Sequence, residues 1–499
     1  MTNFNFSFDP GTSIQQMTGF QIAGQIWSTY LKDNTTLNIH VGVSSSLPKN
    51  IIGGALPGIQ ASQNYKKVAS QLVDDRKSTD DFSATDNLQI KADYEAQFDI
   101  FDLKNGNNKG SRVKSKSINL TSANAKSIGI GGGDPTDLDG VILMNDLNGT
   151  TVGWDYDFTR SSAPPKRSLD FLSTALHEIA HILGFVSGVD KPGWLNSQAS
   201  DKVGLDRYKK SLDNRISNTT TLDLFRYSTA AGENINDLSY GSVGSDKFFS
   251  VDGGKTSIAK FSTGEDRSLG GDGEQASHWK DQKNPIGIMS PTLERGARVN
   301  ISGVDLRALD VIGWDVDASG INTPIDWSQL IIQAKQQLAS RLGQTVSWLE
   351  NNSTIAAQSL SQNRDQDVSK MIAQSQIYKW DPGADDPFWQ KIQNLYFQEG
   401  LFQRLAPEAA MADRPSIEIQ WGSSANVSSM VQPAFLQKVT AFEHSMSLDL
   451  RWTGVETQDT KGTAQHHHAK SGILRKWKSY PSAQTPQDRT LEVKMLDLV

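Results

Sequence analysis

The residues whose types and spacing could do chemistry lie in one short stretch, His177-Glu178-Ile179-Ala180-His181. In an α-helix, side chains four positions apart lie on the same face, so His177 and His181 would point the same way. That spacing suits two imidazole nitrogens that bind one zinc ion. Glu178 directly follows the first histidine, so its carboxylate can reach a metal-activated water and serve as general base. The stretch therefore predicts a hydrolytic zinc site.

The surrounding residues predict that this stretch lies on a buried helix. Apolar residues have helical spacing over 166–186, and Pro164-Pro165 precedes the segment while Gly184 and Gly188 follow its core. A glutamate buried between two buried histidines is costly without a metal or another ionic partner. This context favours a metal site over a chance match to the motif.

The third metal ligand is not given by the local pattern. The string HEIAHILGF is similar to the HExxHxxG pattern of the zinc proteases called metzincins, which place the third ligand three residues after the glycine. That position is Ser187 here, and serine is a poor zinc ligand. A glutamate from a later helix, as in thermolysin-like sites, has no nearby candidate because none lies between Glu178 and Glu233. A remote histidine is the remaining alternative.

The chain has 8 histidines, so each can be considered singly. His40 lies in an alternating β-branched segment and is interpreted as a packed strand residue. His444 and the triplet at 466–468 lie in a polar C-terminal part. His278 differs, because it lies in a polar loop that leads to Met289 in the sequence IMSP, which is typical of a Met-turn. This pattern favours Met289 as a Met-turn residue and leaves His278 as the candidate for the third ligand.

With these residues in place, the chain resembles the leishmanolysin-like branch of the metzincins, in which a long insertion separates the helix from the third histidine. The flanking segments over residues 1–320 are also similar to a group of bacterial, largely cyanobacterial, metalloproteases. The residues that carry the likeness to the branch are His177, Glu178, His181, Gly184, Phe185, Ser277-His278-Trp279 and Met289-Ser290-Pro291.

The resemblance implies a fold and a set of roles. His177, His181 and His278 would bind Zn²⁺, and Glu178 would be the general base. The fold would be α+β, with a metzincin-like mixed twisted sheet, an active-site helix and a Met-turn. The strand expected at 139–146 would be the upper edge strand of the cleft, where an extended peptide adds to the sheet. One departure is that the stretch SPTLERGARVN directly after Met289 contains no tyrosine to support an oxyanion. Arg295 or Arg298 would have to replace it unless both are salt-bridging surface residues.

The composition excludes several other classes of function. The 499 residues include no cysteine, which rules out disulfides, thiolate ligands and thiol nucleophiles. The formal net charge of −7 argues against a dedicated nucleic-acid binder. No apolar run approaches the roughly 18 residues of a transmembrane helix, and the first residues show no standard signal peptide. We expect a secreted or cell-surface protein, with a cytoplasmic one as the alternative.

The pattern along the chain predicts three parts. Residues 1–320 would form the catalytic domain, with an insertion at 188–276 of polar loops and short strands. Residues 321–405 are expected to be mainly helical, and residues 406–499 a divergent, partly disordered tail. The elements expected from periodicity are helices at 12–32, 64–74, 166–186, 305–314, 325–352, 365–377 and 388–405 and strands at 36–43 and 139–146.

These observations predict a zinc metalloendopeptidase that hydrolyses peptide bonds of a protein or peptide substrate, with water as the nucleophile and Glu178 as the base. No nucleophile motif such as GxSxG is present, which agrees with direct attack by water. The alternative is a catalytically silent, zinc-containing surface or binding protein, which the missing tyrosine and the helical C-terminal part would favour. A metallohydrolase for small substrates is a third possibility.

Overall fold

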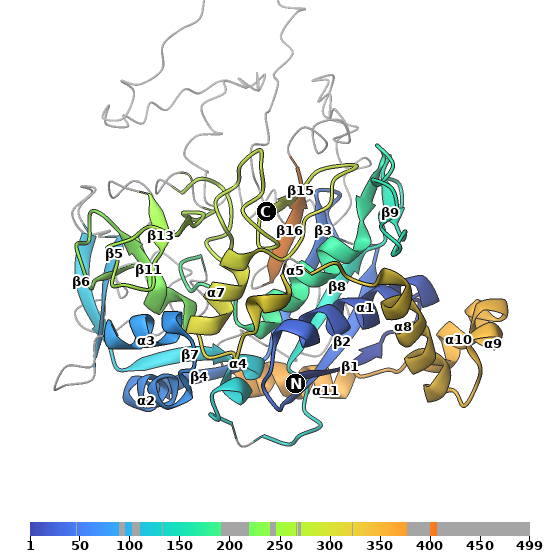
Figure 1. The fold of residues 1–499 in the computed structure, drawn as a ribbon, viewed down its shortest axis with the longest axis horizontal. Coiled ribbons are helices and arrows are strands. Elements are labelled where there is room, and N and C mark those ends of the chain that lie inside the picture. The colour runs from blue at the N-terminus through green and yellow to red at the C-terminus, as the bar shows by residue number, and fades with distance from the viewer. Residues whose placement is uncertain are drawn as a thin grey trace, which may run out of the picture. The chain divides into compact units, whose positions relative to one another are not determined.

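The computed structural model describes one compact unit within residues 1–414 (Figure 1). Part of the predicted insertion, most of the helix expected at 388–405 and almost all of the predicted tail lie outside the described residues. The described residues are 1–45, 47–88, 95–101, 110–131, 133–190, 219–239, 246–265, 267, 271–321, 323–376 and 400–406.

A six-stranded mixed sheet forms the centre of this unit, with the order β1-β2-β8-β3-β16-β15. β1, β2 and β8 are mutually parallel, and β15 is parallel to β16. β3 is antiparallel to both of its neighbours, β8 and β16. The bounds are β1 (Asn3–Phe8), β2 (Thr36–Ser44), β3 (Ile51–Pro57), β8 (Gly140–Asn145), β15 (Thr292–Leu293) and β16 (Leu401–Leu405).

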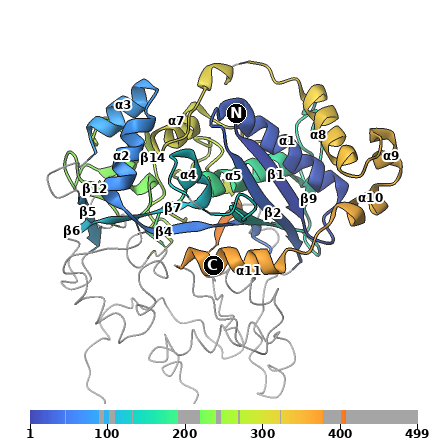
Figure 2. The same ribbon diagram turned by 90° about the horizontal axis from the view of Figure 1, so that it is seen from below.

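Helices cover both faces of this sheet (Figures 1 and 2). α1 (Ile14–Tyr30) and α5 (Phe171–Leu183) pack against each other on one face, where the Trp27 indole donates a hydrogen bond to the Leu176 carbonyl at 3.1 Å. α11 (Asp365–Ser375) contributes Met371 to an apolar cluster with sheet residues such as Leu143 on the other face. The site helix α5 is therefore fixed between the sheet and α1.

Smaller sheets and further helices complete the unit. α8 packs on α1, so the predicted helical region contacts the N-terminal part of the chain. The remaining helices are α2 (Tyr65–Asp75), α3 (Thr79–Asp86), α4 (Ser122–Ser127), α7 (Gly303–Val311), α8 (Trp327–Arg341), α9 (Val346–Asn351) and α10 (Ser353–Leu360). The remaining strands are β4 (Ile59–Asn64), β5 (Ala96–Phe101), β6 (Gly110–Ser115), β7 (Ser117–Thr121), β9 (Gly153–Asp155), β10 (Ser168–Asp170), β11 (Arg226–Ser228), β12 (Asn236–Asp237), β13 (Lys247–Phe249) and β14 (Ala259–Lys260).

Local sequence signals explain several helix boundaries. α1 begins after Ser13, whose hydroxyl accepts from the Gln16 backbone while the Gln16 side chain accepts from the Ser13 backbone. α7 begins after Ser302 with the same reciprocal capping. The α+β class is thus observed, with helices in place of most segments predicted to be helical. No helix within the described ranges is long and apolar enough to cross a membrane.

Two predictions about strands and helices are wrong. The strand predicted at 139–146 is present as β8, but it lies between β2 and β3 and is not an edge strand. Its six residues are all buried, as expected for an interior strand. The end of the helix predicted at 388–405 is instead β16, because Leu401–Leu405 hydrogen-bonds to β3 and β15. Pairing with distant strands decides both cases, and periodicity along the chain does not show it.

Candidate metal centre

Helix α5 places two histidines on one face. Asp170 caps its N-terminus by accepting from the Ser173 amide at 3.0 Å. His177 and His181 lie one turn apart, and both side chains are fully buried. The helix ends at Gly184, whose φ of 120° is a conformation that glycine adopts without steric cost. The sequence-predicted geometry of this pair is therefore present.

A loop brings His278 to the same point. The Nε2 atoms of the three histidines lie 3.1 Å (His177–His181), 3.2 Å (His177–His278) and 3.2 Å (His181–His278) apart. His278 is fully buried, like the other two. The three residues form a group that could hold a metal ion. Two histidines of one helix and a third about a hundred residues away are thus brought together in one buried group.

The second nitrogen of each ring is oriented by the main chain. Each Nδ1 lies within hydrogen-bond distance of a backbone carbonyl, which can only accept, so the proton is on Nδ1 and the Nε2 lone pair is free. Metal-binding histidines are typically held in this way. The pairs are His177 with Ile288 O (2.7 Å), His181 with Phe185 O (2.8 Å) and His278 with Gln275 O (3.1 Å).

The spacing and chemistry of this donor set fit zinc. For a tetrahedral ion with Zn–N distances of about 2.05 Å, neighbouring nitrogens lie about 3.3 Å apart, close to the 3.1–3.2 Å found here. Three unprotonated Nε2 atoms at this separation repel one another unless a cation lies between them. Three protein ligands leave the fourth tetrahedral position open, which is typical of catalytic zinc sites.

Burial keeps two of the three histidines in the protonation state that metal binding requires. Burial lowers the pKa of His177 to about 4. Burial, together with the neighbouring His181 and His177 rings, lowers the pKa of His278 well below its ordinary value. Both rings are therefore neutral at pH 7, as a ligand must be.

Glu178 lies against β3 beside this group. Its side chain is fully buried, and burial raises its pKa well above the ordinary value, opposed by the Gln403 backbone. Neither carboxylate oxygen accepts a hydrogen bond of normal geometry from the described residues. A Cβ atom at Gly53 would lie 2.9 Å from Glu178 Oε1, so β3 approaches the carboxylate closely because this position is glycine. A buried carboxylate without a hydrogen-bond donor among the described residues is suited to accept a hydrogen bond from a water molecule or from a substrate.

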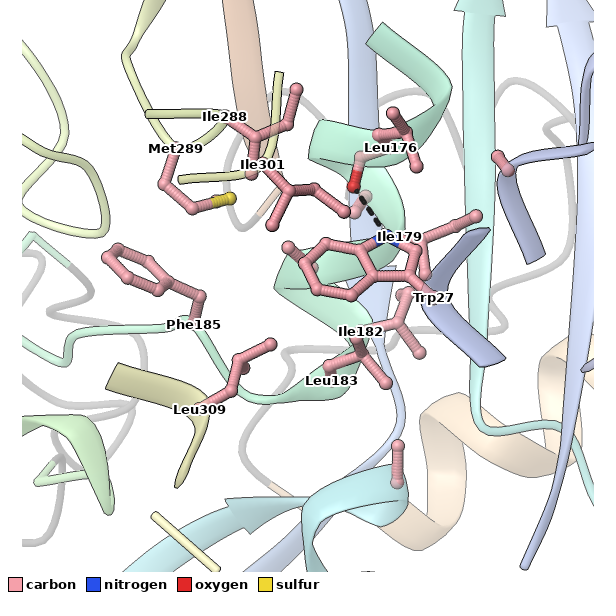
Figure 3. Close-up of a cluster of buried hydrophobic side chains, with 14 of the residues drawn as sticks. Trp27, Leu176, Ile179, Ile182, Leu183, Phe185, Ile288, Met289, Ile301 and Leu309 are labelled. Carbon is pink, nitrogen blue, oxygen red and sulfur yellow. Dashed lines mark hydrogen bonds between the residues drawn. The ribbon is translucent and has the colours of Figure 1, made fainter. Parts of the chain in front are cut away.

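The predicted Met-turn is a tight turn at Ile288-Met289, and Met289 is fully buried beside Ile301 (Figure 3). The turn touches the metal centre through the Ile288 carbonyl that orients His177. Asp305 stabilises the turn by accepting hydrogen bonds from the amides of Ile288 (2.9 Å) and Met289 (3.3 Å). Its carboxylate also accepts from the Trp279 indole at 2.7 Å. One buried carboxylate thus links the turn to the residue that follows His278.

The other residues considered in the sequence have structural partners. Ser187 donates to Asp223 at 2.6 Å and is not part of the histidine group. His40 is buried on β2, where its Nδ1 lies 3.0 Å from the Ser7 hydroxyl. Arg298 lies within 3.6 Å of the carboxylates of Asp155, Asp157 and Asp170. His444, the triplet at 466–468 and the tail lie outside the described residues.

Sequence reasoning missed three residues around the site. Asp305 could have been found, because Ser302 and Asp305 have the spacing of a capping box. Gln275 lies three residues before His278, but its contact with β16 has no sequence signal. Gln403 lies far along the chain, and only the folded sheet shows that it reaches α5.

Comparison with known proteins does not assign the chain to a family. No protein-family model matches the chain, and neither a curated protein nor a solved structure matches it. The functional argument therefore rests on the residues of the site.

Proposed function

We propose that this protein is a zinc-dependent endopeptidase of the metzincin type. The observation that carries the proposal is the convergence of three Nε2 atoms within 3.2 Å of one another beside the buried Glu178 carboxylate. A structural zinc site would normally supply a fourth protein ligand. The histidine group, among the described residues, contains three members. An open coordination position next to a carboxylate is the arrangement that hydrolysis requires.

The roles of the residues follow from their positions. His177, His181 and His278 would hold the ion, which supplies Lewis-acid polarisation of the substrate carbonyl and lowers the pKa of a water molecule towards about 7. Glu178 takes one proton from the attacking water as its oxygen bonds to the carbonyl carbon. Glu178 then returns that proton to the amide nitrogen when the C–N bond breaks. The products are a carboxylic acid and an amine, and no covalent enzyme intermediate forms.

Metal content and proteolysis test this proposal separately. The wild-type protein should bind one Zn²⁺ per chain by elemental analysis and should digest casein in a chelator-sensitive reaction. His278→Ala should lose the metal, whereas His40→Ala, which removes a buried histidine outside the group, should keep it. Full zinc occupancy in His278→Ala would refute the third-ligand assignment.

The general base is tested by a second pair of variants. Glu178→Gln should keep zinc and lose proteolysis by at least about 100-fold, within the range that general-base catalysis contributes. Glu294→Gln, a matched change at an exposed position, should behave as wild type. If the zinc-loaded wild-type protein and the zinc-loaded Arg404→Glu variant both cleave neither casein nor a peptide library, the catalytically silent zinc protein is favoured instead.

A further inference from the structure

Strand β16 lies across the face of the candidate site as an extended peptide. It pairs antiparallel with β3 on one side and parallel with β15, directly after the Met-turn, on the other (Figure 1). The Arg404 amide donates to Pro291 O at 2.8 Å, and the Ala406 amide donates to Leu293 O at 3.0 Å. β16 thus fills the gap between β3 and the segment that follows Met289.

The register directs one side chain of β16 toward Glu178. Gln403 is paired with Gly53, and directly opposite residues of a sheet project from the same face. A Cβ at Gly53 would meet Thr174 at 2.7 Å and Glu178 at 2.9 Å, so this face is the one covered by α5. The Gln403 side chain is fully buried, and both of its polar atoms lack a hydrogen-bond partner among the described residues. Gln403 therefore lies on the face of β16 that α5 covers, on the side of Glu178, with its amide unsatisfied among the described residues.

The loop that carries His278 also binds β16. The Gln275 side chain donates to Gly400 O at 3.1 Å and accepts from the Phe402 amide at 2.9 Å. The same residue supplies the carbonyl that orients His278. The main chain of β16 is therefore hydrogen-bonded to β3, to the segment after Met289 and to the Gln275 side chain. A peptide substrate that adds to the sheet would be held in the same way.

Ion pairs of Arg404 hold the C-terminal end of β16. Arg404 lies 3.3 Å from Glu265 and 3.2 Å from Glu274, and its guanidinium also donates to Gly273 O at 2.9 Å. The Arg404 side chain is 9 % exposed, whereas Glu265 is 29 % and Glu274 15 % exposed, so these ion pairs are only partly protected from solvent. Two glutamates around one arginine form an acidic subsite for a basic residue.

We propose that residues 400–406 act as an intramolecular pseudosubstrate that closes the peptide-binding edge of β3 to other peptides. This inference rests on the proposed peptidase function. Both edges of β3 are occupied, one by β8 and the other by β16, so an incoming peptide can pair with β3 only after β16 has left. The occupant also predicts the preferred substrate, which runs antiparallel to β3 and carries a basic residue where Arg404 lies.

A reversible disulfide tests whether β16 must leave. The chain has no cysteine, so Ala55→Cys/Leu401→Cys introduces a single thiol pair. These residues are directly opposite in the register, at the Cα separation of about 5 Å that a disulfide spans. The control Ala55→Cys/Ile142→Cys instead ties β3 to β8, which need not separate. A phosphine reductant avoids the zinc binding of dithiols.

We expect the oxidised Ala55→Cys/Leu401→Cys variant, called the lock below, to have at least tenfold lower kcat/KM on a fluorogenic peptide than its reduced form. Oxidation should not change kcat/KM of the control pair. Equal activity of the locked and reduced forms would overturn the inference and leave the peptidase proposal intact. Failure of the thiols to pair, measured by mass spectrometry, would overturn the register on which it depends.

A readout without catalysis separates the two proposals. The rate at which a chelator removes zinc should be slower in the oxidised lock than in its reduced form, because β16 covers the centre. If neither the oxidised nor the reduced protein cleaves peptides, but the chelator still removes zinc more slowly from the oxidised form, the peptidase proposal fails. The inference that β16 covers the site is then retained. If the rates are equal, β16 does not guard the site.

Loosening the strand should have the opposite effect. Arg404→Glu places a like charge between Glu265 and Glu274, so β16 should detach more often and kcat/KM should rise at least fivefold. Lys335→Glu, a charge reversal on the surface of α8, should leave kcat/KM unchanged. A folded Arg404→Glu variant with unaltered activity and unaltered zinc release would count against the pseudosubstrate.

Discussion

Asp305→Asn is the substitution that most directly tests how the metal centre is supported. The Asp305 carboxylate is buried and accepts five hydrogen bonds, from the Trp279 indole, the amides of Ile288 and Met289, and the amide and hydroxyl of Ser302. All five partners are donors, so they are satisfied by two acceptor oxygens. Asparagine has the same shape but replaces one oxygen with an NH₂ group, which cannot accept.

The expected cost follows from counting the donors that lose their acceptor. In either amide orientation at least two buried or part-buried N–H groups face the new NH₂ group, and each unsatisfied buried donor costs about 1–3 kcal/mol. The free energy of unfolding should therefore fall by about 2–6 kcal/mol. The Ile288 carbonyl that orients His177 should also shift, which should weaken zinc binding about 10–100-fold, as for other indirect supports of metal ligands.

Urea unfolding followed by circular dichroism measures the first effect, and zinc competition with a chromophoric chelator measures the second. Asp326→Asn is the matched control, because Asp326 caps α8 and asparagine is an equally good cap. If Asp305→Asn loses less than about 1 kcal/mol of unfolding free energy and keeps its zinc affinity within twofold, the reasoning about this carboxylate is wrong.

Three further predictions concern other positions. Gly53→Ala should displace Glu178 and lower peptidase activity at least tenfold at unchanged zinc content, and activity equal to wild type would contradict the close packing. Burial and neighbouring carboxylates raise the pKa of Asp33 to about 7, so its contribution to stability is full below the unfolded pKa of about 4 and is lost as the pH rises through 7. Asp33→Asn should accordingly be about 1–3 kcal/mol more stable than wild type at pH 8 and equal to it at pH 4 in thermal unfolding, and a gain at both pH values would exclude the titration as its cause. Lys247→Met should cost about 3–5 kcal/mol in urea unfolding because it leaves the buried Asp237 carboxylate without its cation, and a loss below 1 kcal/mol would show that the pair is dispensable.

The histidine group could be predicted from the sequence because each part has a local signal. The spacing of His177 and His181 fixes their common face once the helix is recognised, and the turn residues around Met289 mark the third segment. Joining His278 to the pair took a resemblance and not a rule of spacing. The structure supplies that step as three interatomic distances.

The sheet could be predicted only in part, because strand order depends on contacts between distant segments. The apolar run of β8 predicts a strand, but its edge position is implied only by the resemblance, and the sheet places it between β2 and β3. The five residues of β16 are predicted to be the end of a helix. A run this short shows no strand periodicity of its own that separates it from the helical pattern before it. The strand conformation of β16 comes from pairing with β3 and from the ion pairs of Arg404 with Glu265 and Glu274, and these partners lie far away in the sequence.

The carbonyls that orient the three histidines have a consequence for how the site tolerates mutation. All three are main-chain groups, of Ile288, Phe185 and Gln275, and every residue type carries one. Ring orientation is therefore encoded in the path of the backbone, and a side-chain exchange at these positions leaves the acceptor in place. Sequences that diverge widely around the three histidines and Glu178 can then retain the same arrangement, provided that the turns keep their backbone path.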